Sequence, residues 1–358
     1  MYSDSDIEAA VAAGALTPQA ADALRAYVAR SRATPAVDEE HFRLLTGFND
    51  IFVAIAAVIL LVALSWFGHA IRFGPPGTPS PLGGAFVAAA AWGLAEFFTR
   101  QRRMALPSII LLLAFVGGVF AACAFTARNI VSEATLQENG VLQGLIYAGC
   151  AAVAAAAAWV HWRRFRVPIT IAAGAAAVAG IGAGLVDSAV QNAPQYSAAM
   201  LGFTLVAGLA IFLFAMWWDS SDPKRETRRS DVAFWLHLLA APMIVHPIFS
   251  LLGLTDGQAS VPEAVIVLLV YVLLGLTALA IDRRALLVSA LAYVLWALSD
   301  LFERFGAVEL SFALTALLIG SALLLLSAFW HNARRAVVRP LPAQLQARLP
   351  GLERPATA

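Results

Sequence analysis

The segment IFVAIAAVILLVALSWFG, Ile51 to Gly68, contains no charged residue. A helix rises about 1.5 Å per residue, so about twenty apolar residues cross the roughly 30 Å hydrocarbon layer of a membrane. Similar runs recur along the 358 residues, of which 60% are hydrophobic and 13% charged, whereas an average soluble domain has about 25% charged residues. The sequence therefore predicts an all-α, polytopic helical membrane protein.

Charged residues, glycines and prolines divide the chain into about ten predicted transmembrane helices. They cover residues 49–68, 82–99, 105–126, 141–160, 167–189, 198–218, 232–253, 262–281, 285–303 and 308–330. Residues 1–45 predict a small cytoplasmic helical hairpin and linker, in which Gly14 ends one helix and Thr17 caps the next. The ten-span bundle then occupies residues 46–331. Residues 332–358 contain four prolines and predict a flexible cytoplasmic tail.

The distribution of Lys and Arg predicts the orientation. With a cytoplasmic N-terminus, all but Arg72, Arg128 and Arg304 of the 24 Lys and Arg residues fall on the cytoplasmic side. This is the positive-inside pattern. It predicts a multi-pass protein of the bacterial inner (plasma) membrane with both termini in the cytoplasm and the lipid bilayer as its surroundings. The basic turn KRETRR is typical of a cytoplasmic loop, and no nucleic acid partner is predicted.

A resemblance to a known family rests on the start of the chain. GALTPQAADAL, Gly14 to Leu24, the first span GFNDIFVAIAAVILL and the basic turns in mid-chain resemble bacterial polytopic membrane proteins of the domain-of-unknown-function 2157 type. The likeness covers mainly the first hundred residues. It implies a membrane location and this topology, and it implies no activity.

The predicted seventh span contains two histidines and two prolines, in WLHLLAAPMIVHPIFSLLG, Trp235 to Gly253. Nine residues at about 100° each place His237 and His246 on opposite faces, so they are not expected to share one ligand or metal. Pro242 and Pro247 each remove a helical hydrogen bond and predict a kink. His237 is most simply a structural histidine that bonds a freed carbonyl or a neighbouring helix.

The predicted ninth span supplies a partner for His246. Asp300 lies at about the same depth as His246, and Tyr293 belongs to the same polar stripe of that helix. We expect His246 to contact Asp300 and to form with it a candidate solute or proton site. Ionisable residues inside a membrane are costly and often functional. In the alternative interpretation, Asp300 pairs with Arg304 at the outer interface.

The segment GIGAGL contains Gly180 and Gly184 in a GxxxG pattern, which predicts close packing of two membrane helices. The sequence has no Walker A, HExxH or GxSxG motif and no CxxC pair, so no enzymatic activity, cofactor or metal site is predicted. Cys123 and Cys150 both fall in apolar segments, where a thiol most often serves as a small hydrophobic side chain.

Two functional hypotheses follow from these features. The leading hypothesis is a transporter or permease for a small solute, because deep polar groups beside a proline-broken helix are typical of such binding sites. The alternative is a non-transporting membrane scaffold or sensor that recruits a partner through the N-terminal hairpin. The sequence predicts neither the solute nor the oligomeric state.

Overall fold

A computed structural model of the protein describes residues 7, 10–24, 48–72, 77–222, 227–251, 261–284, 287, 291, 294–295, 311–346 and 349. The chain divides into two compact units, Met1–Arg43 with Glu353–Ala358 and Leu44–Leu352. In the first unit, residues 18–24 are helical. The Thr17 hydroxyl accepts a hydrogen bond from the Ala20 N–H at 3.2 Å, which is the geometry of a helix cap. The complete hairpin includes residues outside the described ranges and stays a prediction.

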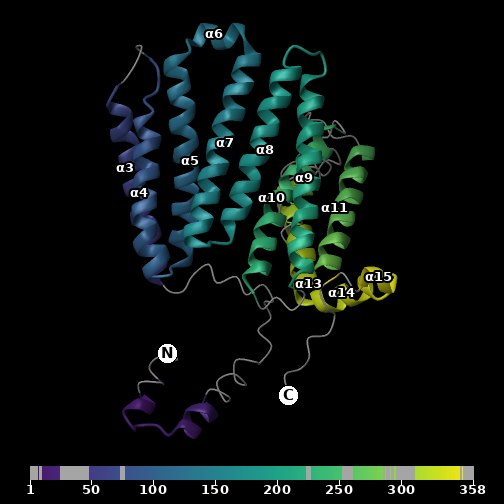
Figure 1. The fold of residues 1–358 in the computed structure, drawn as a ribbon. Helices are drawn as coiled ribbons and strands as arrows, with labels where there is room; N and C mark the ends of the chain where they lie inside the picture. The colour runs from purple at the N-terminus through teal and green to yellow at the C-terminus, as the bar shows by residue number, and fades with distance from the viewer. Residues whose placement is uncertain are drawn as a thin grey trace. The chain divides into compact units, whose positions relative to one another are not determined.

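The second unit is built mainly of helices, and none of its described residues lies in a β-strand (Figure 1). In chain order the helices are α3 (Phe48–Ala70), α4 (Leu82–Ala95), the π-helix η1 (Glu96–Gln101), α5 (Ala105–Ile130), α6 (Glu133–Glu138), α7 (Gly140–Phe165), α8 (Ile169–Val190), α9 (Tyr196–Ser220), α10 (Arg228–Leu251), α11 (Val261–Ile281), α13 (Ser311–Ala328), α14 (Trp330–Val338) and α15 (Ala343–Gln346).

Seven helices in the described part of the chain are long and apolar enough to cross a membrane. They are α3, α4 continued by η1, α5, α7, α8, α9 and α10, and they match the first seven predicted spans. The helices α11 and α13 lie where the eighth and tenth spans are predicted. Most of residues 285–303, the predicted ninth span, fall outside the described residues. The apolar helices indicate a multi-pass membrane protein, and the number ten stays a prediction.

The turns from η1 to α5, from α7 to α8 and from α9 to α10 lie at one end of the bundle, together with the end of α11 (Figure 1, lower end). Most of the arginines that flank the spans gather in these turns. We call this end of the bundle the basic end.

Helix α10 is the most enclosed of the seven candidate spans. In its most apolar window 56% of the residues are buried, compared with 17% in α9. It packs against α9 along most of its length and also against α8. Pro242 and Pro247 both lie inside α10, which continues through them as one helix from Arg228 to Leu251. The prolines therefore do not divide this span into two helices.

Glycines bring α7 and α8 into backbone contact. A Cβ atom placed on Gly184 would lie 2.6 Å from the Gly144 carbonyl oxygen, and one on Gly144 would lie 2.6 Å from the Gly184 carbonyl oxygen. Real side chains do not approach this closely, so only glycine fits at both positions. A Cβ on Gly180, one turn earlier in α8, would meet the Cβ of Ala151 at 3.3 Å. The two glycines of the GxxxG pattern thus lie on the face of α8 that contacts α7.

The segment after residue 330 differs from the predicted flexible tail. Helix α14 begins at Trp330 and leaves the axis of α13 at an angle of 76°. Trp330, Arg334 and Val338 are buried at a spacing of four residues, and Asn332, Arg335 and Arg339 are exposed. This segment is helical because its apolar residues repeat at helical spacing and cover one face, although the sequence around them is polar.

Candidate functional site

Three polar side chains meet at the basic end of the bundle: Asp219 from the last turn of α9, His237 from α10 and Arg283 from the turn after α11. The Arg283 guanidinium donates to both carboxylate oxygens of Asp219, at 2.5 Å and 3.2 Å. The His237 Nε2 lies 3.0 Å from Asp219 Oδ2. Their exposed fractions are 5% for Asp219, 0% for His237 and 2% for Arg283. We call these three residues the buried triad.

A further contact ties Arg283 to the first turn of α10. The same guanidinium nitrogen that contacts Asp219 Oδ1 also donates to the backbone carbonyl of Ser230 at 3.1 Å and lies 3.3 Å from its hydroxyl. One arginine therefore joins three segments of the chain: α9 through Asp219, α10 through Ser230, and α11 through its own backbone. Separating any two of these segments at the basic end requires breaking charge-assisted hydrogen bonds in a buried site.

The backbone at the end of α11 directs Arg283 into the bundle. Asp282 has a left-handed backbone conformation with φ of 58°. The Arg283 N–H donates to the Ala278 carbonyl at 2.9 Å, and the Asp282 N–H donates to the Leu279 carbonyl at 3.3 Å. This is a Schellman motif, which ends a helix and reverses the chain. Glycine is the usual residue at the left-handed position, and aspartate is one of the few other residues that tolerate it.

The side chain of Asp282 contributes to a second buried contact. Its Oδ1 accepts a hydrogen bond from the Trp330 indole N–H at 2.7 Å and lies 3.8 Å from the Nε of Arg334. The guanidinium of Arg284 lies over the Trp330 ring, 4.9 Å from the ring centroid. The three residues of the DRR turn therefore have different environments: Asp282 and Arg284 contact α14, and Arg283 contacts α9 and α10.

The triad has a balanced charge when His237 is neutral. An ionised Asp219 only accepts hydrogen bonds, so Nε2 of His237 carries the hydrogen in its contact with Oδ2. The Asp219 carboxylate and the Arg283 guanidinium then cancel each other's charge. Among the described residues, no group of three His, Cys, Asp or Glu side chains is arranged to hold a metal ion. The chemistry available at the triad is the gain or loss of a proton.

A second buried histidine lies near the same end of the bundle. His161 of α7 is 0% exposed, and its Nδ1 lies 3.4 Å from the Thr170 hydroxyl of α8. The aromatic rings of Trp92, Phe115 and Phe165 surround it, with centroids 4.6 to 6.2 Å from the imidazole. This environment is apolar apart from Thr170, so His161 packs as part of the core between α4, α5 and α7.

The predicted site residues fall into three groups. His237 bonds a neighbouring helix, as the structural interpretation predicts, and its partner is Asp219. His246 is exposed on α10. Tyr293 and Asp300 lie outside the described residues, so the contact between His246 and Asp300 stays a prediction.

Sequence reasoning missed Asp219 and Arg283 as site residues. Arg283 was counted only among the basic residues on the cytoplasmic side, but Arg283 and its neighbour Asp282 are buried. The sequence does contain a signal for this site, namely an aspartate within the last turn of an apolar span. Glu96 lies four residues before Arg100 at the same end of the bundle, and the two side chains are in contact at 3.4 Å. The shorter contacts of Glu96 are with Arg164 of α7, at 2.7 Å and 2.9 Å.

Comparisons of this chain with protein-family models, with curated proteins and with solved structures find no match. The resemblance to the family with the domain of unknown function 2157 stays a prediction. The geometry of the buried triad is therefore the basis for inferring a function.

Proposed function

We propose that this protein is a transporter or permease for a small solute and that the buried triad controls access at the basic end of the bundle. The observation that carries the proposal is the Asp219–Arg283–His237 contact, which joins α9, α10 and the end of α11 in a site closed to solvent. In this proposal the basic end faces the cytoplasm of a bacterial cell, in agreement with the positive-inside pattern.

The energetic cost of the triad supports a functional role. A buried ion pair is often no more stabilising than apolar side chains of the same volume. The apolar packing around α10 would join the same helices without charges, so stability alone does not explain a charged triad.

Protonation of Asp219 would break its ion pair with Arg283. The carboxylate accepts hydrogen bonds from both Arg283 and His237, and protonation removes its charge and turns one oxygen into a donor. Arg283 would then be a buried cation without its counter-charge, a state that favours separation of α9 from the end of α11. Proton uptake and opening of the basic end are thereby linked, as proton-coupled transport requires.

Transport assays on reconstituted protein test this proposal. Proteoliposomes that contain a pH-sensitive dye would be screened with pools of amino acids, sugars, nucleosides and organic cations for solute-dependent proton movement. We expect Asp219→Asn to abolish the movement and Asp219→Glu, which keeps the carboxylate, to retain part of it. Glu96→Gln is the matched control, because it removes a carboxylate at the same end outside the triad. Equal transport by the wild type and Asp219→Asn would remove the triad from the mechanism.

The scaffold or sensor hypothesis has one observation in its favour. Residues Met1–Arg43 group with Glu353–Ala358 in a compact unit distinct from Leu44–Leu352, so the N-terminal segment has the separate organisation that partner recruitment would use. Deleting residues 1–40 distinguishes the two functions. A scaffold would lose its partner in a pull-down, whereas a transporter would keep its flux.

A further inference from the structure

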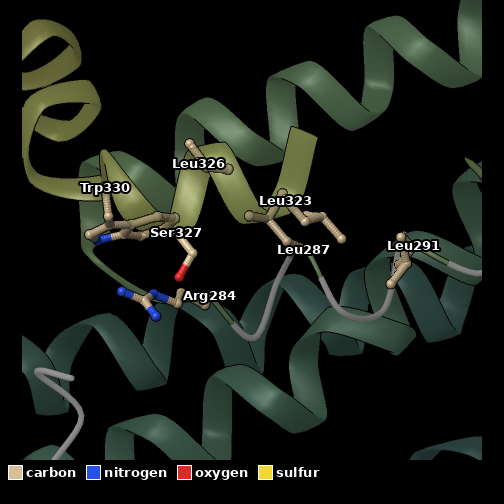
Figure 2. Close-up of a pocket in the computed structure, with 7 residues that line it drawn as sticks. All are labelled: Arg284, Leu287, Leu291, Leu323, Leu326, Ser327 and Trp330. Atoms are coloured by element: carbon tan, nitrogen blue, oxygen red, sulfur yellow. The ribbon is translucent and has the colours of Figure 1, made fainter. Parts of the chain in front are cut away.

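The C-terminal helix α14 is connected to the buried triad through three consecutive residues. Arg283 belongs to the triad, and its two neighbours in the chain, Asp282 and Arg284, both contact Trp330 of α14. Figure 2 shows Arg284 and Trp330 together at the junction of α13 with α14. The arginine that joins α9 to α10 is thus flanked on both sides by residues that contact α14.

The contacts of Asp282 with α14 are buried and involve charged groups. The Trp330 indole N–H donates to Asp282 Oδ1 at 2.7 Å, and the Arg334 Nε lies 3.8 Å from the same oxygen. All three residues are buried. Because a buried carboxylate is costly unless it is paired and hydrogen-bonded, these contacts favour a state in which α14 stays against the DRR turn.

The left-handed backbone of Asp282 depends on such support. A φ of 58° is unfavourable for a residue with a Cβ atom and persists where the surrounding structure determines it. This conformation directs Arg283 to Asp219, where the guanidinium bonds both carboxylate oxygens. In an ordinary backbone conformation of Asp282 the next side chain would point elsewhere, and hydrogen bonds of this geometry would be lost.

A cavity of about 120 Å³ lies beside the same junction, and Arg284 and Trp330 are among its lining residues (Figure 2). The lining is chiefly apolar, with leucines from α13 and from the chain after α11. Protein interiors are otherwise close-packed. The cavity therefore provides space for the movement of Trp330 that release of α14 from the turn requires.

We propose that α14 regulates the basic end of the bundle and that Trp330 is a positioning residue for Arg283. While α14 holds Asp282 in the left-handed conformation, Arg283 stays on Asp219 and the basic end is closed. When α14 leaves the turn, Asp282 relaxes and the contact between α9 and the end of α11 opens. The use of this movement to pass a solute rests on the proposed function, whereas the coupling of α14 to the triad does not.

Hydrogen exchange of the full-length protein in detergent measures the coupling without any solute. Trp330→Phe keeps an aromatic ring and removes a hydrogen bond to a charged group, so the open fraction of the basic end should rise at least about tenfold. We expect correspondingly faster amide exchange in the last turn of α9 and the first turn of α10. Exchange where α7 meets α8, at Gly144 and Gly184, should stay unchanged. The control Phe329→Leu, at an exposed ring, should exchange like the wild type.

Two double variants separate positioning from the loss of a hydrogen bond alone. Trp330→Phe would be combined with Asp282→Gly and, separately, with Asp282→Ala, and both combinations remove the carboxylate that Trp330→Phe leaves unpaired. Glycine adopts the left-handed conformation without support, and alanine does not. We therefore expect the glycine variant to regain slow exchange in α9 and α10, and the alanine variant to exchange about tenfold faster than the glycine variant.

Equal exchange of the two double variants would overturn the proposal, because the backbone conformation of residue 282 would then have no influence on the triad. Unchanged exchange of α9 and α10 in Trp330→Phe would overturn it as well. If Trp330→Phe alone unfolds the protein, the comparison of the double variants still decides. Coupling in a protein that moves no solute would contradict the proposed function and support this inference.

Discussion

Replacing Asp219 by asparagine removes one charge from the buried triad and keeps the shape of the side chain. Arg283, which is 2% exposed, would then keep its charge without the carboxylate that accepts two of its hydrogen bonds. Breaking a buried ion pair by removing one partner costs about 3 to 5 kcal/mol. We therefore expect Asp219→Asn to lower the free energy of unfolding by about that amount.

The ion pair between Glu96 and Arg164 provides the comparison within the same molecule. Its side chains are 31% and 40% exposed, and exposed pairs contribute only about 0.2 to 1 kcal/mol. Glu96→Gln should thus be at least about 2 kcal/mol less destabilising than Asp219→Asn. Equilibrium unfolding in mixed micelles with increasing sodium dodecyl sulfate, followed by tryptophan fluorescence, measures both. Equal losses for the two variants would refute the argument from burial.

Removing both charges of the pair separates stability from function. In the double variant Asp219→Leu with Arg283→Met, no uncompensated charge remains, and the fold should regain most of the roughly 3 to 5 kcal/mol that the single change costs. Its transport should nevertheless stay absent, because the carboxylate whose protonation opens the contact in the proposed mechanism is gone. A double variant no more stable than Asp219→Asn would show that the cost does not come from the unpaired Arg283.

Two further predictions concern packing and the DRR turn. Gly184→Ala should destabilise the bundle by about 1 to 3 kcal/mol because its Cβ would overlap the backbone of α7. The control Gly174→Ala in the same helix meets only the Cβ of Ala158 at 3.7 Å and should be neutral or slightly stabilising. The same unfolding titration compares the two variants. Trp330→Phe should lower the free energy of unfolding by about 1 to 3 kcal/mol, because it removes the indole N–H that bonds the buried Asp282 carboxylate. Phe329→Leu, at a neighbouring exposed ring, is the control. A decrease for Trp330→Phe no larger than that for Phe329→Leu would contradict this prediction.

The sequence predicted the helices well and the triad poorly, for different physical reasons. The apolar run in α3 defines a span by itself, and Arg163 and Arg164 mark the end of α7. Local hydropathy and charge were therefore sufficient to predict these helices. The triad depends on which helices are neighbours. Asp219 and Arg283 are 64 residues apart, and nothing in either local segment indicates that they meet. The positive-inside pattern places Arg283 on the cytoplasmic side, but it does not indicate that the Schellman motif at Asp282 directs this arginine into the bundle.

The glycine contact between α7 and α8 has a mechanical consequence. Because Gly144 and Gly184 meet backbone to backbone, no side chain between them can change rotamer to let the helices slide. The two helices must therefore rotate or tilt as a single stiff element. Any large movement in the bundle must then occur at its other interfaces, and in the proposed transport mechanism it occurs at the ionic contact of α9 with the end of α11.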